Sequence, residues 1–170
     1  MGQMEVVGIR VESPAAQPVL LLREVGGERY LAIWIGQNEA ASIALHQKGI
    51  EPPRPLTHDL IVDLVETFGQ KLEQVRIVDM REGTFYAEMV FADSVVVSAR
   101  PSDAVAVAMR SGAEIHADEE VLAEAGLMIP DEDEVEGSGL KEDEVERFKE
   151  FLDQVSPDDF NMGEGNAGGD

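Results

Sequence analysis

The spacing of apolar and polar residues divides the first 110 residues of the chain into two similar halves. In the first half, residues 4–12, 18–25 and 29–35 are rich in valine, leucine and isoleucine and are separated by turn residues, which predicts three strands. A helix is predicted over residues 39–48, with Asn38 as its cap and Gly49 at its end. In the second half, residues 74–81, 84–91 and 94–99 predict three strands, and residues 103–110 predict a helix.

Two further patterns complete the predicted domain. Residues 57–68, with Thr57 as the cap, predict a helix that has one apolar and one acidic face. The apolar face holds Leu60, Ile61, Leu64, Val65 and Phe68. The opposite face holds Asp59, Asp63 and Glu66. A short strand is predicted near residues 114–116, and a last helix, capped by Asp118, extends to about residue 125.

The two halves align as a repeat of three strands and one helix. The helices match without gaps, so that Glu39-Ala40 corresponds to Asp103-Ala104 and Ile43-Ala44 to Val107-Ala108. We therefore predict the α+β class, with a mixed β-sheet, a duplicated β-β-β-α unit, helices packed on the sheet and an acidic C-terminal extension. Alanine is common in buried helices, so chance similarity is the alternative to duplication.

Charge separates the C-terminal segment from the rest of the chain. Of the net charge of −22, residues 1–130 contribute 20 acids and 10 bases, and residues 131–170 contribute the other 15 acids and 3 bases. We predict a domain over residues 1–130, followed by an acidic linker, a short helix at about residues 140–155 and a disordered tail. An acidic chain has no general attraction for phosphate backbones, so binding of nucleic acid requires a local basic patch or metal ions.

The residue types that are absent narrow the function classes. The chain has no cysteine, which excludes disulfides, thiolate metal sites and thiol catalysis. The sequence shows no signal-peptide pattern and no apolar run of the roughly 18 residues that a membrane span needs. We therefore expect a soluble cytoplasmic protein.

Two stretches share an arginine-proline opening followed by a helix with an early acid: RPLTHDL at residues 54–60 and RPSDAVAVAMR at residues 100–110. Pro101 suits the first turn of a helix, Ser102 is a good cap, and Asp103 falls where a negative charge is favourable. The residues that follow are small and apolar, so this helix must be buried. Arg100 and Asp103 therefore lie where a buried helix begins, and the two openings indicate a shared site.

The charged and titratable residues at these openings have both a functional and a structural interpretation. His58 and Asp59 can bind a divalent metal or exchange a proton, whereas the structural alternative is that Asp59 offsets the helix dipole. Asp103 needs a partner in partly dry surroundings, and Arg100 is the nearest in sequence, so the pair is either a site or a structural brace. Glu39 corresponds to Asp103 in the repeat, which makes it a second candidate ligand or an ordinary first-turn acid.

Other charged residues and motifs give weaker evidence for a functional site. Arg110, at the far end of the buried helix, is expected to pair with a carboxylate or with the helix C-terminus, in a structural role. His46 and His116 have no evident companions. The sequence contains no glycine-rich phosphate loop after a strand, no serine nucleophile elbow and no histidine pair with zinc spacing. The residues alone therefore lead to an α+β domain with a carboxylate and arginine site.

At RPLTHDL and RPSDAVAVAMR the chain resembles the bifunctional nuclease family of bacterial and plant proteins. The resemblance extends to the strand around Val7-Gly8-Ile9, the segment IGQNEAASIA and the segment GTFYAEM, so it spans about residues 4–127. It implies hydrolysis of both RNA and DNA by an α+β domain with a duplicated unit of three strands and a helix. It assigns no catalytic residues. Some relatives carry a motif similar to the interaction helix of excision-repair proteins, which residues 140–155 do not match.

The resemblance and the chemistry of the two openings give a first hypothesis, a metal-assisted nuclease acting on RNA and DNA. The catalytic candidates are His58, Asp59 and Asp103. The candidates for binding substrate phosphate are Arg54, Arg100 and Ser102. The candidate metal ligands are Asp59, Asp103 and Glu39. Mg²⁺ or Mn²⁺ suits such carboxylate ligands.

The second hypothesis is a non-catalytic regulatory or protein-binding module. The two openings are then folding braces or a small-ligand pocket, and the acidic tail docks a basic partner. The tail can also lie over a basic cleft and compete with nucleic acid. Self-association into a homo-oligomer is a further expectation, with a second copy covering the face that carries Asp59; no membrane partner is expected.

Overall fold

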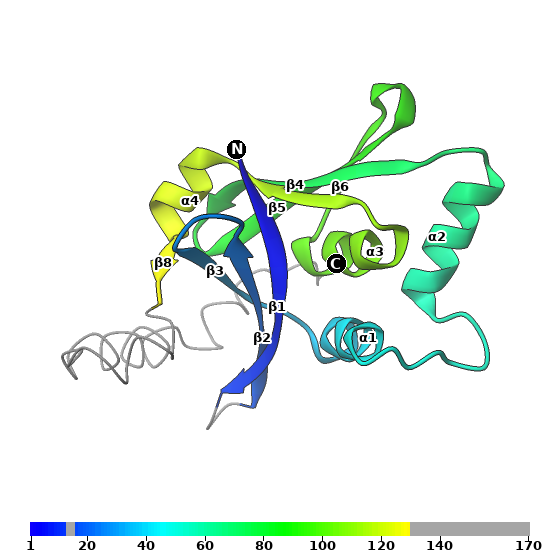
Figure 1. The fold of residues 1–170 in the computed structure, drawn as a ribbon, viewed down its shortest axis with the longest axis horizontal. Coiled ribbons are helices and arrows are strands. Elements are labelled where there is room, and N and C mark those ends of the chain that lie inside the picture. The colour runs from blue at the N-terminus through cyan, green and yellow to red at the C-terminus, as the bar shows by residue number, and fades with distance from the viewer. Residues whose placement is uncertain (13–15, 130–170) are drawn as a thin grey trace, which may run out of the picture. The chain divides into compact units, whose positions relative to one another are not determined.

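The structure, a computed structural model, describes residues 1–12 and 16–129, which form eight strands and four α-helices (Figure 1). The strands are β1 (Gly2–Glu12), β2 (Gln17–Glu24), β3 (Arg29–Trp34), β4 (Leu72–Arg81), β5 (Thr84–Phe91), β6 (Val96–Ala99), β7 (Glu114–Ala117) and β8 (Leu127–Met128). The helices are α1 (Gln37–Gln47), α2 (Thr57–Thr67), α3 (Pro101–Ser111) and α4 (Glu119–Ala125). A 3₁₀ turn, η1 (Ala92–Ser94), precedes β6. The predicted acidic linker, C-terminal helix and tail lie outside the described residues.

The strands form one sheet in the order β6-β5-β4-β7-β1-β2-β3-β8. Strands β4 and β7 pair in parallel, and the other neighbouring pairs are antiparallel. Each predicted half is present as an antiparallel run, β1-β2-β3 on one side of β7 and β4-β5-β6 on the other. The mixed sheet and the duplicated β-β-β-α unit are therefore confirmed.

The two corresponding helices, α1 and α3, pack against each other as well as on the sheet. Helix α1 contacts β1 and β2, whereas α3 contacts β4, β5 and β7. Helix α2 packs against α3, and α4 packs against β3 and β4, far from α2 (Figure 1). Helix α3 is therefore surrounded by the sheet and two helices, which matches the burial predicted from its sequence.

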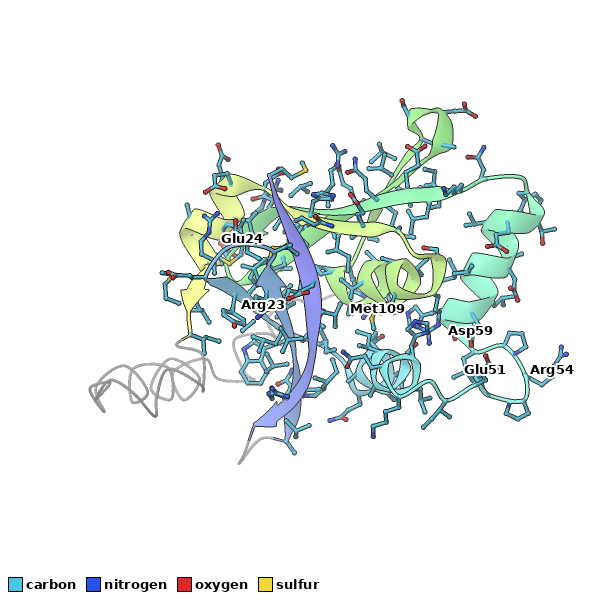
Figure 2. All side chains as sticks on the ribbon, viewed as in Figure 1. Arg23, Glu24, Glu51, Arg54, Asp59 and Met109 are labelled. Atoms are coloured by element: carbon cyan, nitrogen blue, oxygen red, sulfur yellow. The ribbon has the colours of Figure 1, made fainter. Side chains whose placement is uncertain are left out.

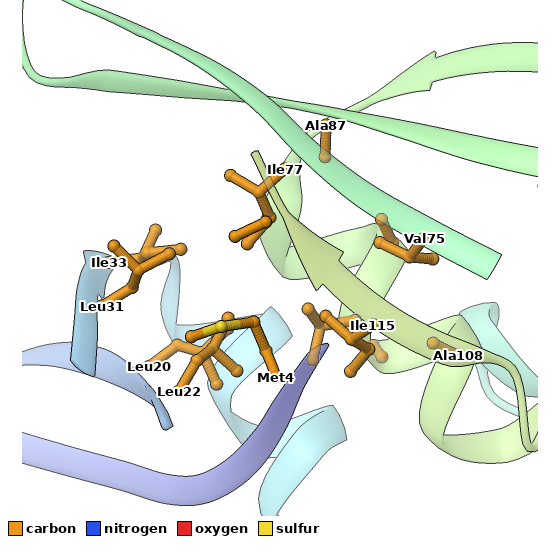
Figure 3. Close-up of a cluster of buried hydrophobic side chains, with 14 of the residues drawn as sticks. Met4, Leu20, Leu22, Leu31, Ile33, Val75, Ile77, Ala87, Ala108 and Ile115 are labelled. Carbon is orange, nitrogen blue, oxygen red and sulfur yellow. The ribbon is translucent and has the colours of Figure 1, made fainter. Parts of the chain in front are cut away.

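The core lies between the sheet and these helices, and Figure 3 shows part of it. Leu20, Leu22 and Leu31 come from the first half, and Val75, Ile77 and Ala87 from the second. On α3 the five residues from Ala104 to Ala108 are almost completely buried. Because these side chains are small, α1 and α2 can approach α3 closely. No helix in the described part of the chain is long and apolar enough to cross a membrane.

The predicted helix caps need correction. Helix α3 begins at Pro101, with Arg100 as the N-cap, because proline needs no N–H partner and suits the first turn. Ser102 therefore lies inside the helix. Helix α1 begins at Gln37 after Gly36, since the carbonyl of Gly36 already accepts the N–H of Ala40, so Asn38 is not its cap.

Helix α2 also begins one residue earlier than predicted. Its N-cap is Leu56, so Thr57 is the first helical residue, because the Asp59 carboxylate accepts the backbone N–H of Leu56 at 2.8 Å. Strand β6 begins at Val96, two residues after the predicted position, since η1 turns the chain first with positive φ angles at Asp93 and Ser94. Strand β8 has two residues and was too short to predict.

The core predicts a large difference between two leucine-to-alanine variants. Leu31 is fully buried, so Leu31→Ala is expected to lower the free energy of unfolding by about 2–5 kcal/mol. Leu60, which is half exposed on α2, is the matched control, and Leu60→Ala should change it by about 0.5 kcal/mol. Urea denaturation followed by circular dichroism measures both; equal losses would contradict this assignment of the core.

Candidate functional site

The first turns of α1, α2 and α3 meet around a chain of polar contacts. Glu39 belongs to the first turn of α1, His58 to that of α2 and Asp103 to that of α3. Contacts of 2.7–2.9 Å link them: His58 contacts Asp103 directly, and Arg100, the residue just before α3, contacts both Asp103 and Glu39. The helices are brought together by their common packing on α3, so residues 61 and 45 positions apart in sequence become neighbours.

Arg100 joins two carboxylates from different helices. Its Nε donates to Asp103 Oδ2 at 2.8 Å, and its Nη2 donates to Glu39 Oε1 at 2.7 Å. These hydrogen bonds, to Asp103 first and Glu39 second, raise the pKa of the Arg100 guanidinium above its usual value. The side chain is 64% exposed. Arginine has five N–H donors and these bonds use two, so the remaining donors can bind an anion.

His58 is buried between Asp103 and Ser42. Its Nε2 lies 2.9 Å from Asp103 Oδ1, and its Nδ1 lies 2.8 Å from Ser42 Oγ. An ionised carboxylate can only accept, so Nε2 donates to Asp103, and Nδ1 shares the second hydrogen bond with the Ser42 hydroxyl. The result is a continuous Ser42–His58–Asp103 chain of hydrogen bonds. Sequence reasoning did not include Ser42, which looks like one more small residue of a helix.

Asp103 is held in its charged form. Burial by itself raises the pKa of this carboxyl, but hydrogen bonds from His58 and Arg100 and the charge of Arg100 outweigh burial, so the pKa is lowered. The Asp103 side chain is 29% exposed. Asp103 therefore offers a negative charge that is oriented by two partners and remains within reach of solvent. The predicted Arg100–Asp103 pair is confirmed.

Asp59 belongs to a neighbouring pair. Its Oδ1 accepts from Arg110 Nε at 2.6 Å, and Arg110 also donates to the backbone carbonyls of Ala106 and Ser42. Burial raises the pKa of Asp59, but the hydrogen bonds from Arg110 and from the Leu56 N–H outweigh it, and the pKa is lowered. Arg110 is buried. Its expected pairing with a carboxylate is thus confirmed, and Ser42 links this pair to His58.

The remaining candidates lie apart from this network. Ser102 is buried in the first turn of α3. Arg54 projects from the connection between α1 and α2, further from α3 than Asp59 (Figure 2). It is exposed and forms no ion pair with another residue in the described part of the chain. Of the two predicted phosphate-binding arginines, the structure brings only Arg100 to His58 and Asp103.

The predicted metal ligands are divided between the two pairs. Glu39 and Asp103 contact the same guanidinium, whereas Asp59 contacts Arg110. Within residues 1–12 and 16–129, no three His, Asp or Glu side chains cluster closely enough to form a metal site from protein groups alone. The three predicted metal ligands therefore do not form one cluster within the described residues.

Comparisons with known proteins agree on one family. The family model described as "Bifunctional nuclease domain" matches residues 20–130. A Mycobacterium tuberculosis protein, from strain H37Rv and named as uncharacterized, is 65% identical over 161 residues, which are 94% of this chain and 98% of that protein. "Bifunctional nuclease 1" of Oryza sativa subsp. japonica is 22% identical over 124 residues, 69% of this chain and 38% of the rice protein. The chain thus corresponds to well under half of that rice protein.

The Asp59–Arg110 pair predicts how stability depends on pH. The folded-state pKa of Asp59 lies below its unfolded value of about 3.9, so its contribution is complete above that value and is lost as the pH falls through the folded-state pKa. Asp59→Asn is expected to lower the free energy of unfolding by about 1.5–3 kcal/mol at pH 7. As the pH falls, the free energy of unfolding of this variant should decrease less than that of the wild type.

Urea denaturation at a series of pH values from neutral to acid measures this difference. Asp63→Asn, on the exposed face of the same helix, is the matched control and should follow the wild-type pH dependence. Parallel curves for Asp59→Asn and the wild type would show that the Asp59–Arg110 pair does not stabilise the fold.

Proposed function

This chain belongs to the bifunctional nuclease domain family, and we propose that it is a nuclease that hydrolyses phosphodiester bonds of RNA and DNA. The observation that supports this most directly is the junction of Arg100, Asp103 and His58. It combines an oriented carboxylate with an exposed cation and a histidine, each of which lies within hydrogen-bonding distance of that carboxylate. These are the groups that bind a phosphate and move a proton.

In this proposal Arg100 binds the phosphodiester. The two carboxylates hold its guanidinium by Nε and Nη2, so its remaining N–H donors point away from these contacts. They would bind two phosphate oxygens and neutralise the charge that grows on them during attack by water. Because Asp103 and Glu39 fix the Arg100 guanidinium before the substrate binds, the reaction loses little entropy in ordering this side chain.

Asp103 and His58 would act on the attacking water. The exposed part of the Asp103 carboxylate orients the water and accepts its proton, while the Nε2–H of His58 holds the other carboxylate oxygen. The oxygen of water forms a bond to phosphorus, and the bond from phosphorus to the leaving oxygen breaks. The leaving oxygen takes a proton from solvent.

Asp59 has a supporting role in this mechanism. The sequence placed it among the catalytic candidates, and its pairing with the buried Arg110 favours a positioning role instead. Arg110 also binds the carbonyl of Ser42, whose hydroxyl contacts His58. Asp59 would therefore act on His58 through Arg110 and Ser42.

A divalent ion remains part of the proposal. Mg²⁺ is commonly held by one or two carboxylates together with substrate phosphate, and Glu39 and Asp103, which face one cation already, fit that donor set. Bound there, Mg²⁺ or Mn²⁺ would neutralise phosphate charge and lower the pKa of a bound water.

One observation favours the alternative function, a non-catalytic regulatory or protein-binding module. Each carboxylate of the junction already has an arginine partner, Glu39 and Asp103 sharing Arg100 and Asp59 having Arg110. Such pairs also brace three helices without any chemistry. The two functions differ in what happens when Arg100 is removed, because a brace on an exposed arginine contributes little stability.

The proposed nuclease predicts distinct losses of activity. Arg100→Ala is expected to lower kcat/KM by about 100- to 1000-fold, because it removes a preorganised donor to the phosphate. His58→Asn should lower it by about 100-fold or more. Initial rates of cleavage of labelled single-stranded RNA and DNA by the purified full chain measure both effects.

The outer face of the sheet supplies matched controls. Arg81→Ala and His116→Asn remove the same residue types from exposed or partly exposed pairs with Asp79 and Glu114. Both should keep wild-type rates. Wild-type cleavage by Arg100→Ala would exclude the proposed site, and absence of cleavage by the wild type would support the non-catalytic module.

The proposed role of a metal predicts a dependence on added ions. Cleavage should fall in a chelator and return with Mg²⁺ or Mn²⁺, and Glu39→Gln should need about tenfold more metal for half-maximal rate. Glu88 lies on β5 and is paired with Arg76 of β4. Glu88→Gln is therefore the control, and its half-maximal metal concentration should equal that of the wild type. Full activity in the chelator would show that the carboxylates act without a metal.

A further inference from the structure

Strand β6 lies at one end of the sheet with one side unpaired by any other described strand. It pairs with β5 from Val96 opposite Val90 to Ala99 opposite Ala87, with no irregularity in register. An open edge of this kind presents backbone N–H and C=O groups that can pair with another strand. Strand β8, at the other end of the sheet, is only two residues long.

The β6 edge lacks two of the features by which proteins commonly protect such edges, a charged side chain and a proline. Residues 94–99, SVVVSA, contain no charge and no proline. Val95, Val96 and Val97 are 49%, 46% and 46% exposed, so three consecutive valines face solvent in a chain that is otherwise strongly acidic. Burial of these side chains requires a partner, and an uncharged edge is where two negatively charged copies meet with least repulsion.

The backbone direction of the edge follows from one hydrogen bond. The N–H of Phe91 donates to the carbonyl of Val95 at 2.8 Å, so Val95 directs its backbone groups toward β5. Because backbone groups alternate along an antiparallel strand, Val97 also faces β5, whereas Val96 and Ser98 direct theirs outward. The free edge therefore has two outward-facing residues, separated by Val97.

We propose that β6 pairs antiparallel with β6 of a second copy of this chain, about a two-fold axis at Val97. In this register Val97 lies opposite Val97 of the second copy, and Val96 lies opposite Ser98. The outward groups of Val96 and Ser98 then form two closely spaced pairs of hydrogen bonds, all within the regular part of the strand. The two sheets join into one, and the contact is the same from both sides, as a two-fold interface requires.

Residues next to the strand support this register. Asp93 and Ser94 have φ angles of 60° and 62°, a strained conformation for residues other than glycine, and they turn the chain away just before β6. Pairing about Val97 places Ser94 of the second copy opposite Arg100, with Asp93 next to it. An acid thus approaches a base at each end of the contact, and a turn of the second copy lies beside the candidate site.

The oligomeric state of the full chain tests this proposal. Sedimentation over a range of protein concentrations should show a monomer–dimer equilibrium. Val97→Lys places two like charges opposite each other at the axis and should raise the dimer Kd by about tenfold or more. Val25→Lys is the matched control, because Val25 is a similarly exposed valine in the turn after β2, and it should leave the Kd unchanged.

Crosslinking tests the register. The chain has no cysteine, so one introduced cysteine reports on a single position. Val97→Cys places two thiols at a non-hydrogen-bonded pair, where Cα atoms are about 4.5 Å apart and a disulfide can form. It should give disulfide-linked dimers on mild oxidation, whereas Val96→Cys, which faces Ser98 of the second copy, and Val25→Cys should give few.

Each outcome bears on the proposal directly. A wild-type chain that stays monomeric at about 100 μM, near the upper range of specific weak association, would overturn it. A dimer that Val97→Lys leaves intact, or that crosslinks equally at residues 25 and 97, would also overturn it, because the interface would then lie elsewhere. Nuclease assays play no part in these measurements, so the result is independent of the proposed activity.

Discussion

The close packing of α3 is the constraint on which the rest of this structure depends. Its inner residues, from Ala104 to Ala108, are almost completely buried, and none is larger than valine. Helices α1 and α2 can therefore both pack against α3, and their first turns come within hydrogen-bonding distance of it. A larger side chain there would separate the helices, since cores tolerate added volume poorly, and the polar junction would be lost together with the packing.

The junction and the neighbouring pair contain two arginines whose energetic roles differ. Arg110 is buried and satisfied by Asp59 and two carbonyls, so removing either partner leaves an uncompensated charge in a poorly solvated place. Arg100 is largely exposed, so water screens its contacts with Asp103 and Glu39 and they add little stability. The buried pair therefore supports the fold, and the exposed pair is the one available to a ligand.

Sequence patterns were sufficient for the parts of the fold that depend on local or periodic signals. Alternation gave the six strands of the repeat, and the apolar run after Asp103 gave the burial of α3. The Arg100–Asp103 pair was also predictable, because its members are three residues apart. Contacts of Ser42 with His58 and of Asp59 with Arg110 join residues 16 and 51 positions apart, and no local signal indicates them.

The resemblance between the two arginine-proline openings predicted a shared site, and His58 of the first opening does contact Asp103 of the second, but the resemblance did not place Arg54 correctly. In the second opening, Arg100 and Asp103 are three positions apart, and the two side chains meet at the start of α3. In the first, Arg54 and Asp59 are five positions apart, and Arg54 remains on the exposed connection. Asp59 was expected on the solvent side of α2, but it contacts Arg110 of α3, whereas Leu60 and Phe68 of the predicted apolar face are 50% and 78% exposed.

The internal repeat explains why one arginine serves two acids. Glu39 and Asp103 occupy equivalent positions, three residues after the N-caps of α1 and α3, and those N-caps are Gly36 and Arg100. A Cβ atom at Gly36 would clash with the Glu39 carboxylate, so a side chain there would push that carboxylate aside. Because glycine stands at position 36, Glu39 has no arginine at the position that corresponds to Arg100, and it shares Arg100 with Asp103. The candidate site thus arises from a difference between two otherwise similar halves, which fixes it on the side of the junction where α3 begins.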